Sequence, residues 1–207
     1  MIQVNNLSLR IKKDLILSDI NIHIKKGEIT GIVGRNGCGK TMLMKCITGF
    51  VKPTEGEVIF GGKKIGRDTD FPDNTGIIIE TPTFIPYYSG MRNLKELAML
   101  KKKIGKKEIE DILKVVGLYE NRNKHVHKYS LGMRQRLGIA QALMENPDTL
   151  ILDEPMNGLD KECVAMVRNI LMDLKEQGKT ILLVSHNSED IGILCDKIYE
   201  MDKGRIV

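Results

Sequence analysis

The segment that most constrains this chain is residues 34–41, GRNGCGKT, which fits the pattern G-x-x-x-x-G-K-[ST] at every fixed position. A strand-like apolar run precedes it and a helical run follows it. A polyphosphate needs several converging backbone N–H donors, and glycine lets the main chain curl tightly and approach the phosphates closely. The segment therefore predicts a loop that binds a nucleoside triphosphate.

Each part of this loop has an expected task. Lys40 supplies a mobile positive charge for the outer phosphates and counts among the catalytic residues, while the Thr41 hydroxyl is expected to bind Mg²⁺. The helix that begins near Lys40 adds the positive end of its dipole. A glycine turn that merely carries Lys-Thr is the alternative, and the flanking strand and helix disfavour it. The residues expected to contact the nucleotide are Gly34, Arg35, Asn36, Gly37, Cys38, Gly39, Lys40, Thr41 and Met42.

Composition sets broad limits. With 207 residues, 42% hydrophobic and 29% charged, the chain is expected to form one large folded domain. The net charge of +5 is mild, and lysines gather only around residues 101–107, which we interpret as a solvated face in preference to a nucleic-acid surface. No apolar run of about 18 residues is present, so a membrane task would require another chain to span the bilayer.

The four cysteines form no C-x-x-C pair, and no secretory leader is recognised. We therefore expect reduced thiols in the cytoplasm. Cys38, inside the phosphate loop, is either an unusually reactive thiol or a small filler residue, and the second interpretation is favoured.

The chain is organised in three parts. Strand-like segments at 2–9, 16–24 and 28–33 lead to a helix at 40–48, a hairpin-like stretch at 56–64 and a strand at 76–80. Helical patterns follow at 92–103, 106–116 and 131–145. The last third alternates strands at 149–152, 180–184 and 198–201 with helices at 161–177 and 189–195.

These segments predict an α/β fold: a phosphate-loop NTPase core with a mainly parallel sheet, an antiparallel β portion and an inserted α-helical subdomain. We expect a single domain over residues 1–207. Its nucleotide-binding core would comprise residues 1–80 and 146–207, and its helical subdomain residues 81–145.

Two further strands end in chemically useful side chains. The segment 149–154, TLILDE, is an apolar strand ending in Asp153, expected to hold the metal, and Glu154, the candidate general base for the attacking water. His186 follows the next apolar strand and should emerge at the same sheet edge, near the outermost phosphate. Alone, an Asp-Glu pair is commonly a solvated turn and a histidine after a strand a loop residue. The ordered set favours function.

These motifs resemble those of the ATP-binding subunits of ATP-binding cassette (ABC) transporters, over essentially the whole chain. Residues 129–136, YSLGMRQR, resemble the family signature LSGGQ followed by Gln-Arg. Asn157-Gly158-Leu159-Asp160 resembles the loop that crosses to a partner subunit, and Ser185-His186 resembles the switch histidine.

The resemblance implies a Mg²⁺-dependent ATPase that works as a head-to-tail homodimer or heterodimer. Each ATP would lie between the phosphate loop of one subunit and the signature of the other, so Ser130, Gly132 and Asp160 would meet the nucleotide across the interface. ATP binding would close the dimer, and hydrolysis would reopen it.

Several positions depart from the family pattern. Tyr129, Leu131 and Met133 stand where Leu, Gly and Gln are usual in the signature. Glu80 stands where relatives carry a metal-contacting Gln, so it is a candidate metal ligand that would add negative charge near Asp153. The adenine-stacking aromatic is missing around residues 10–11, and the chain ends where many relatives continue, as if an extension were absent or the sequence shortened.

Residues 78–94 and the signature resemble the branch associated with bacitracin resistance and lantibiotic immunity, which implies export of a peptide antibiotic or a similar amphipathic compound. Near Glu80, the apolar cluster Phe84, Ile85, Tyr87 and Tyr88 either receives a short helix of a separate transmembrane permease or packs internally. The expected location is peripheral, on the cytoplasmic side of the membrane.

Two other classes of function stay open at this point. One is a soluble ABC-type ATPase acting on nucleic acid or ribosomes, but those relatives usually have a long coiled-coil insertion or two cassettes, neither of which is visible here. A non-hydrolysing regulatory cassette is disfavoured because Lys40, Asp153, Glu154 and His186 are all present. No direct contact with nucleic acid is expected.

Overall fold

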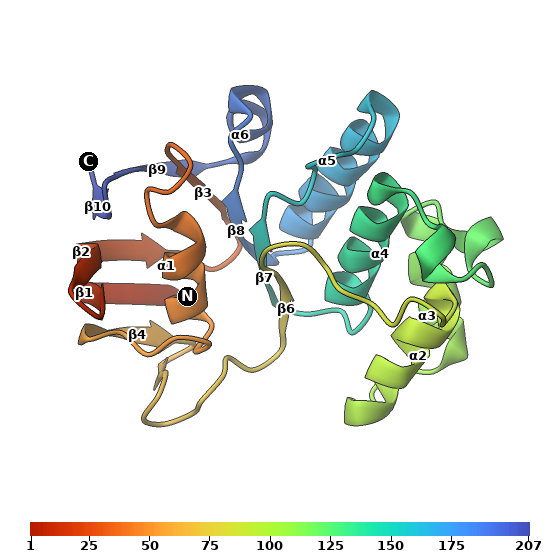
Figure 1. Ribbon diagram of the computed structural model, residues 1–207, viewed down its shortest axis with the longest axis horizontal. Helices are drawn as coiled ribbons and strands as arrows, with labels where there is room; N and C mark the ends of the chain where they lie inside the picture. Colours follow the sequence, from red (N-terminus) through yellow and green to blue (C-terminus); the bar gives the residue numbers. More distant parts are fainter.

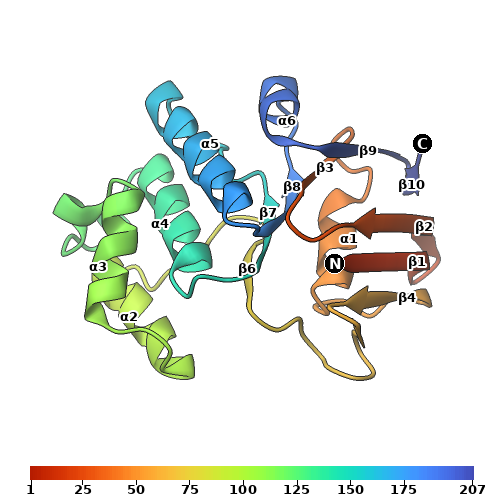
Figure 2. The same cartoon turned by 180° about the vertical axis from the view of Figure 1, so that it is seen from behind.

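The computed structural model describes all 207 residues and contains two β-sheets with helices around them. A six-stranded sheet with the order β10-β9-β3-β8-β7-β6 forms the centre, and a four-stranded sheet with the order β2-β1-β4-β5 lies at one side of it. All pairs in the central sheet are parallel except β9 with β10, and all pairs in the smaller sheet are antiparallel. Figures 1 and 2 show α2, α3 and α4 gathered at the opposite end of the molecule from the smaller sheet.

The strands are β1 (Ile2–Ile11), β2 (Asp14–Ile24), β3 (Ile29–Val33), β4 (Glu55–Phe60), β5 (Lys63–Lys64), β6 (Thr75–Ile78), β7 (Thr149–Asp153), β8 (Thr180–Val184), β9 (Lys197–Asp202) and β10 (Arg205–Ile206). The α-helices are α1 (Lys40–Ile47), α2 (Gly90–Lys101), α3 (Lys106–Val115), α4 (Leu131–Leu143), α5 (Lys161–Glu176) and α6 (Ser188–Leu194). Two short 3₁₀ turns cover Tyr119–Asn121 and Val126–Lys128.

The central strands are apolar throughout because both faces of their sheet are covered. Successive side chains of a strand point to opposite faces. In β7, Leu150 and Leu152 accordingly join one core cluster of 25 buried residues, while Ile151 joins the other of 20. The first cluster packs the sheet against α2 to α5, and the second packs it against α1 and the antiparallel sheet.

This topology brings chemically active segments together. Parallel strands point in the same direction, so the segments after β3, β6, β7 and β8 all leave the same edge of the sheet. The phosphate loop follows β3, Glu80 follows β6, Asp153 ends β7 and His186 follows β8. The edge therefore collects residues that lie far apart in the sequence.

The fold class predicted from the sequence is confirmed, with differences at element ends. The helix expected at 40–48 ends at Ile47, and the strand expected at 76–80 ends at Ile78, because Glu80 has a left-handed backbone (φ 62°) that a strand does not allow. Strand β10 was not predicted, because two residues are too few to show the alternation of apolar and polar side chains that indicates a strand. No helix combines the length and the apolarity required to cross a membrane.

Candidate functional site

The phosphate loop runs from the end of β3 to the start of α1, as the sequence predicts. All three of its glycines have backbones that other residues rarely adopt: φ is 150° at Gly34, 80° at Gly37 and 109° at Gly39. A Cβ atom on Gly34 would lie 2.2 Å from the carbonyl oxygen of Met201, and one on Gly39 would lie 2.8 Å from Leu17. Gly39 also precedes α1 without a side-chain cap, so no side chain occupies the first N–H groups of that helix.

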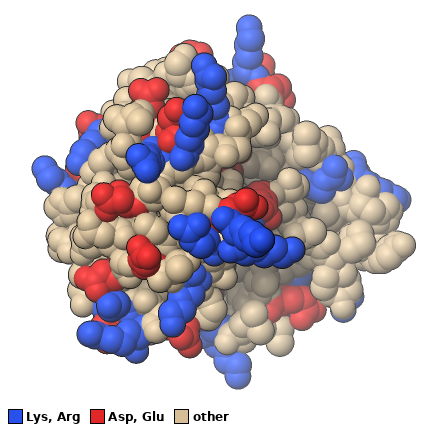
Figure 3. Space-filling model, turned by 60° about the vertical axis from the view of Figure 1, so that its left-hand side comes forward, with Lys and Arg blue, Asp and Glu red and all other residues tan.

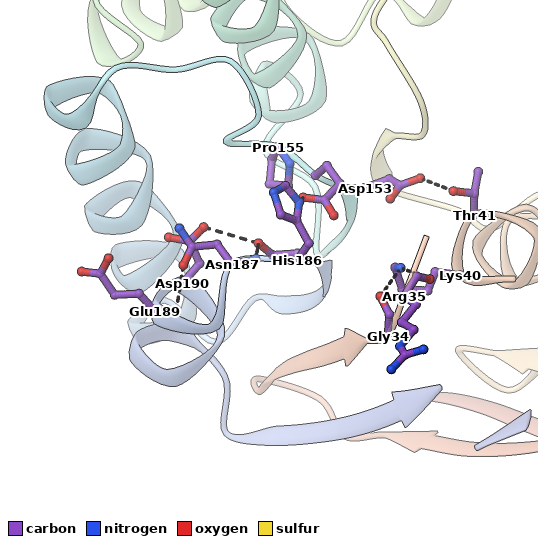
Figure 4. A network of polar contacts seen from close by, with 12 residues as sticks. Gly34, Arg35, Lys40, Thr41, Asp153, Pro155, His186, Asn187, Glu189 and Asp190 are labelled. Carbon is purple, nitrogen blue, oxygen red and sulfur yellow. Dashed lines mark hydrogen bonds and ion pairs between the residues drawn. The ribbon is translucent and has the colours of Figure 1, made fainter. Parts of the chain in front are cut away.

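Lys40 is buried, with 8% of its surface exposed. Its Nζ donates hydrogen bonds to the carbonyl oxygens of Gly34 at 2.6 Å and Arg35 at 3.1 Å (Figure 4). A longer contact, 4.0 Å, joins Lys40 Nζ to Cys38 Sγ. The ammonium group therefore lies across the mouth of its own loop, on acceptors that a phosphate oxygen can replace.

Thr41 and Asp153 meet although 112 residues separate them. The Thr41 hydroxyl donates a hydrogen bond to Asp153 Oδ2 at 2.8 Å (Figure 4). Asp153 is buried, with only 7% of its surface exposed. One hydroxyl and one carboxylate are oxygen ligands of the type that Mg²⁺ prefers, so Thr41 and Asp153 would suit a Mg²⁺ ion bound beside the phosphates. No group of three or more His, Cys, Asp or Glu side chains lies close enough together to hold a metal ion.

Glu154 and His186 form the second polar pair of the site. His186 Nδ1 lies 2.8 Å from Glu154 Oε2, and the Glu154 side chain is 24% exposed while that of His186 is 63% exposed. Glu154 has a left-handed backbone (φ 49°), and its N–H donates to the carbonyl oxygen of Val184 at 2.9 Å. The turn away from β7 thus directs the Glu154 carboxylate toward the segment after β8.

Gln135 supports this turn, although it was not among the site residues predicted from the sequence. Its Nε2 donates to the carbonyl oxygens of Glu154 at 3.2 Å and Pro155 at 3.0 Å, and the residue is buried. The Gln-Arg pair that follows the signature is the sequence feature that could have pointed to this residue. Through Gln135, helix α4 is tied to the backbone of the candidate base.

A network of ion pairs and hydrogen bonds next to His186 was also not predicted from the sequence. Arg168 of α5 donates to Asp190 of α6 through Nε at 2.8 Å and Nη2 at 2.5 Å, and its Nη1 reaches Glu189 at 3.1 Å. Asp190 Oδ2 lies 3.4 Å from the hydroxyl of Ser185, the residue before His186. This partly buried network fixes α6 against α5 next to the histidine loop. Figure 4 shows Asp190 and Glu189 of α6 beside Asn187 and His186.

Two cavities border these residues. One, of about 330 Å³, is lined by the phosphate loop, by Asp153 and Glu154, and by the aliphatic side of Ile16. The other, of about 1060 Å³, lies between the loop, His186 and the strand β9. The phosphate loop, Asp153, Glu154 and His186 thus share one region. Ile16 borders the smaller cavity and residues 10–11 border neither.

Ser130, Gly132 and Asp160 do not line these cavities. Ser130 caps α4 by accepting a hydrogen bond from the Met133 N–H at 3.2 Å. Asp160 caps α5 by accepting one from the Cys163 N–H at 2.8 Å, and this bond lowers the pKa of the Asp160 carboxyl. A contact between these residues and nucleotide bound in the same chain is therefore not formed here, and their role across a dimer interface stays a prediction.

Glu80 was predicted as a metal ligand, and Cys38 as a filler residue or a reactive thiol; the structure shows the surroundings of each. Glu80 is 62% exposed and forms an ion pair with Lys45 at 2.6 Å. It makes no hydrogen bond to Thr41 or Asp153, so its metal role stays a prediction. Cys38 is 6% exposed and packs next to Gly34, as a filler residue would.

The apolar cluster after Glu80 is divided. Phe84 packs against the main core, whereas Ile85 is 48% and Tyr87 is 76% exposed. The buried Asn93 side chain holds this loop by accepting from the Ile85 N–H and donating to the Ile85 carbonyl oxygen. Internal packing therefore accounts for Phe84 and leaves Ile85 and Tyr87 on the surface.

These features define a nucleotide-hydrolysing protein of the phosphate-loop class. They are a glycine-rich phosphate loop between a strand and a helix, a hydroxyl–carboxylate pair and an adjacent Glu–His pair. Charged groups of both signs are interspersed on the face seen in Figure 3. The family model described as "ABC transporter" matches residues 17–157. The chain belongs to the ABC transporter family.

Curated relatives match the chain along its whole length. It is 45% identical to the uncharacterized ABC transporter ATP-binding protein YybJ of Bacillus subtilis (strain 168), covering 94% of that protein. It is 41% identical to the bacitracin transport ATP-binding protein BcrA of Enterococcus faecalis, covering 68% of it. It is also 37% identical to the lantibiotic transport ATP-binding protein SrtF of Streptococcus pyogenes, covering 89%.

A solved relative has the same fold. The dimeric post-hydrolysis state of the ATP-binding cassette MJ0796, bound to ADP and Pi, matches all of this chain and 96% of its own with a TM-score of 0.89 at 26% identity. The chain is an ATP-binding subunit of a membrane transporter, an ATPase that uses ATP and Mg²⁺. Membership implies a second ATP-binding subunit and a membrane permease as partners.

Proposed function

We propose that this chain powers the export of a peptide antibiotic or a similar amphipathic compound from the cytoplasmic side of the membrane. The observation that carries this proposal is the full-length similarity to proteins named for bacitracin and lantibiotic transport, at 41% and 37% identity. Those names support the class of compound, and the outward direction is proposed from the resemblance to the resistance and immunity branch.

Within the site, the roles follow from the contacts. Lys40 exchanges its carbonyl acceptors for oxygens of the outer phosphates. Thr41 and Asp153 would hold Mg²⁺, which would supply positive charge next to those phosphates. Glu154 orients the attacking water and accepts its proton, and His186 holds the Glu154 carboxylate in place.

The remaining site residues act between subunits in this proposal. Ser130 and Gly132 at the start of α4 meet the outer phosphate of ATP bound to the partner subunit, and Asp160 lies in the loop that crosses to it. Glu80 joins the metal region only after it leaves Lys45. The nucleotide-binding core comprises residues 1–80 and 146–207, and the helical subdomain residues 81–145.

The permease docks on the loop between Glu80 and Tyr88. Ile85 and Tyr87 offer exposed apolar surface there, and Asn93 keeps the loop rigid. The loop starts at Glu80, which follows β6, and β6 pairs with β7, the strand that carries Asp153. Docking on this loop is therefore coupled to the nucleotide site.

The proposal is tested by affinity capture with tagged Glu154→Gln protein and Mg-ATP, from detergent-solubilised membranes and from the soluble fraction of the native cell. Recovery of a multi-span permease is expected, and the double variant Ile85→Ser/Tyr87→Ser should recover at least about tenfold less. A matched double variant at exposed Leu15 and Phe50 should behave like the parent. Recovery of ribosomes, nucleic acid or soluble proteins alone would favour the soluble ATPase instead.

Export itself is tested with the recovered permease. Reconstituted into vesicles with this chain, the complex should show ATPase activity that rises when bacitracin or a lantibiotic is added. An unchanged rate with such peptides, in a complex that hydrolyses ATP, would remove the peptide-export assignment and leave the transporter assignment intact.

A further inference from the structure

The end of α2 carries two exposed apolar side chains that no part of the chain covers. Leu100 is 80% and Met99 is 56% exposed, and Leu100 is the most exposed large hydrophobic residue of the molecule. Helix α2 packs inward through Leu94 and Ala98, which lie four residues apart on one face. Met99 and Leu100 lie off that face, so they do not contribute to the core.

The turn that follows is strongly cationic. Residues 101–107, KKKIGKK, hold five lysines and no arginine. Lys101 pairs with Glu145 and Lys106 with Glu110, whereas Lys102, Lys103 and Lys107 form no ion pair. Three nearby acidic groups are already engaged, Asp111 with Lys114, Glu108 with the Gly105 N–H and Asp73 with Lys63. Asp70 lines the same hollow as Lys101 and Lys103 but pairs with neither, so it offsets only part of the positive charge.

Lysine ammonium groups beside exposed aliphatic side chains match the interface of an anionic bilayer. Phosphate headgroups attract the lysines, and the aliphatic chains enter the region just below them. Nucleic acid would match the charge, but it offers no apolar layer for Leu100 and Met99, and the usual arginine contacts are missing. The lysine-rich turn with its apolar neighbours is therefore more complementary to lipid.

The position of this feature suits a surface contact. Figures 1 and 2 show the end of α2 at the lower edge of the molecule and α6 at the opposite, upper edge. None of Met99 to Lys107 lines the cavities beside the phosphate loop. A contact here therefore leaves the nucleotide site free.

We propose that residues 99–107 form a binding surface for anionic phospholipid headgroups, with Lys102, Lys103 and Lys107 attracting the phosphates and Leu100 inserting between them. This contact is independent of the proposed substrate and of the permease, since it needs only this chain and a bilayer. It is weak alone, because each lysine near an anionic surface changes affinity only about fivefold.

The test is flotation of the purified chain with vesicles of phosphatidylcholine alone or mixed with phosphatidylglycerol. We expect binding to the mixed vesicles only, weakened by salt. The variant Lys102→Gln/Lys103→Gln/Lys107→Gln should bind about a hundredfold more weakly, and Leu100→Ser about tenfold. The control Lys12→Gln/Lys13→Gln/Lys26→Gln removes three exposed charges elsewhere and should retain binding within about twofold.

Two results would overturn the proposal. One is equal loss in the control and in the turn variant, which would mean a non-specific charge effect. The other is binding of fluorescent duplex DNA by the turn without binding to phosphatidylglycerol vesicles, which would assign the lysines to nucleic acid. Thermal unfolding and ATP binding, measured on each variant, verify that the altered chains are folded.

Discussion

His186 Nδ1 and Glu154 Oε2 lie 2.8 Å apart, although Glu154 follows strand β7 and His186 follows strand β8. Parallel neighbours in the sheet place both side chains at one edge, and the left-handed backbone of Glu154 turns its carboxylate toward the histidine. The pair joins the candidate base to a group that can fix its orientation.

Replacement of this histidine should affect hydrolysis and not binding. In His186→Ala, the Glu154 carboxylate loses its partner, so we expect the steady-state ATPase rate to fall about a hundredfold while ATP affinity stays within about threefold. His125→Ala, at a histidine outside the site, is the control. Equal ATPase rates in His186→Ala and the parent would remove the positioning role.

Asp153→Asn should change the dependence on Mg²⁺. The amide keeps an oxygen near Thr41 but loses the negative charge, so the Mg²⁺ concentration that gives half-maximal ATPase activity should rise at least about tenfold. Asp148→Asn serves as the matched control, because Asp148 is exposed and bonds Asn74 instead. An unchanged Mg²⁺ dependence in Asp153→Asn would assign the metal to other ligands.

Arg168→Met should destabilise the fold. It would leave the Asp190 carboxylate, 3% exposed, without its cation, and breaking a buried ion pair costs about 3 kcal/mol or more. Urea unfolding measures the change. Glu189→Gln removes only the charge of the 67% exposed carboxylate in the same network and should cost far less than Arg168→Met. Equal, small losses in both variants would show that the Arg168–Asp190 pair adds little.

The thiol of buried Cys46 and that of partly buried Cys195 should resist alkylation. Burial raises the pKa of Cys46 to about 12 and, with the nearby Asp196 charge, that of Cys195 to about 11, from the ordinary value of 9.0. Because the folded state holds these protons more tightly, their contribution to stability is complete below pH 9 and declines as pH rises toward 11 and 12. At pH 8, mass spectrometry after iodoacetamide should show both thiols unmodified in the native chain and modified in urea. Rapid native modification would contradict their burial.

The sequence was sufficient for features that depend on local pattern. Residues 34–41, the strand ending at Asp153 and the histidine after β8 are each a short motif between strongly patterned elements, and the fold class followed from their order. The parallel edge that unites them is a general property of such sheets.

Features that depend on tertiary packing were not predictable. The Arg168–Asp190 pair joins residues on two helices whose relative position the sequence does not specify. The ion pair of Glu80 with Lys45 requires the left-handed backbone at Glu80, which no local pattern indicates in a non-glycine residue. Gln135 reaches the backbone of Glu154 only because α4 packs beside that turn.

The account rests most directly on Glu154 as the base, and single-turnover hydrolysis by Glu154→Gln protein with Mg-ATP tests it. The amide is close in shape but cannot accept the proton, so ATP should bind normally, hydrolysis should slow by about a hundredfold or more, and size exclusion should show a stable ATP-bound dimer. Hydrolysis by Glu154→Gln at the parent rate, with the dimer no more stable than before, would contradict the account.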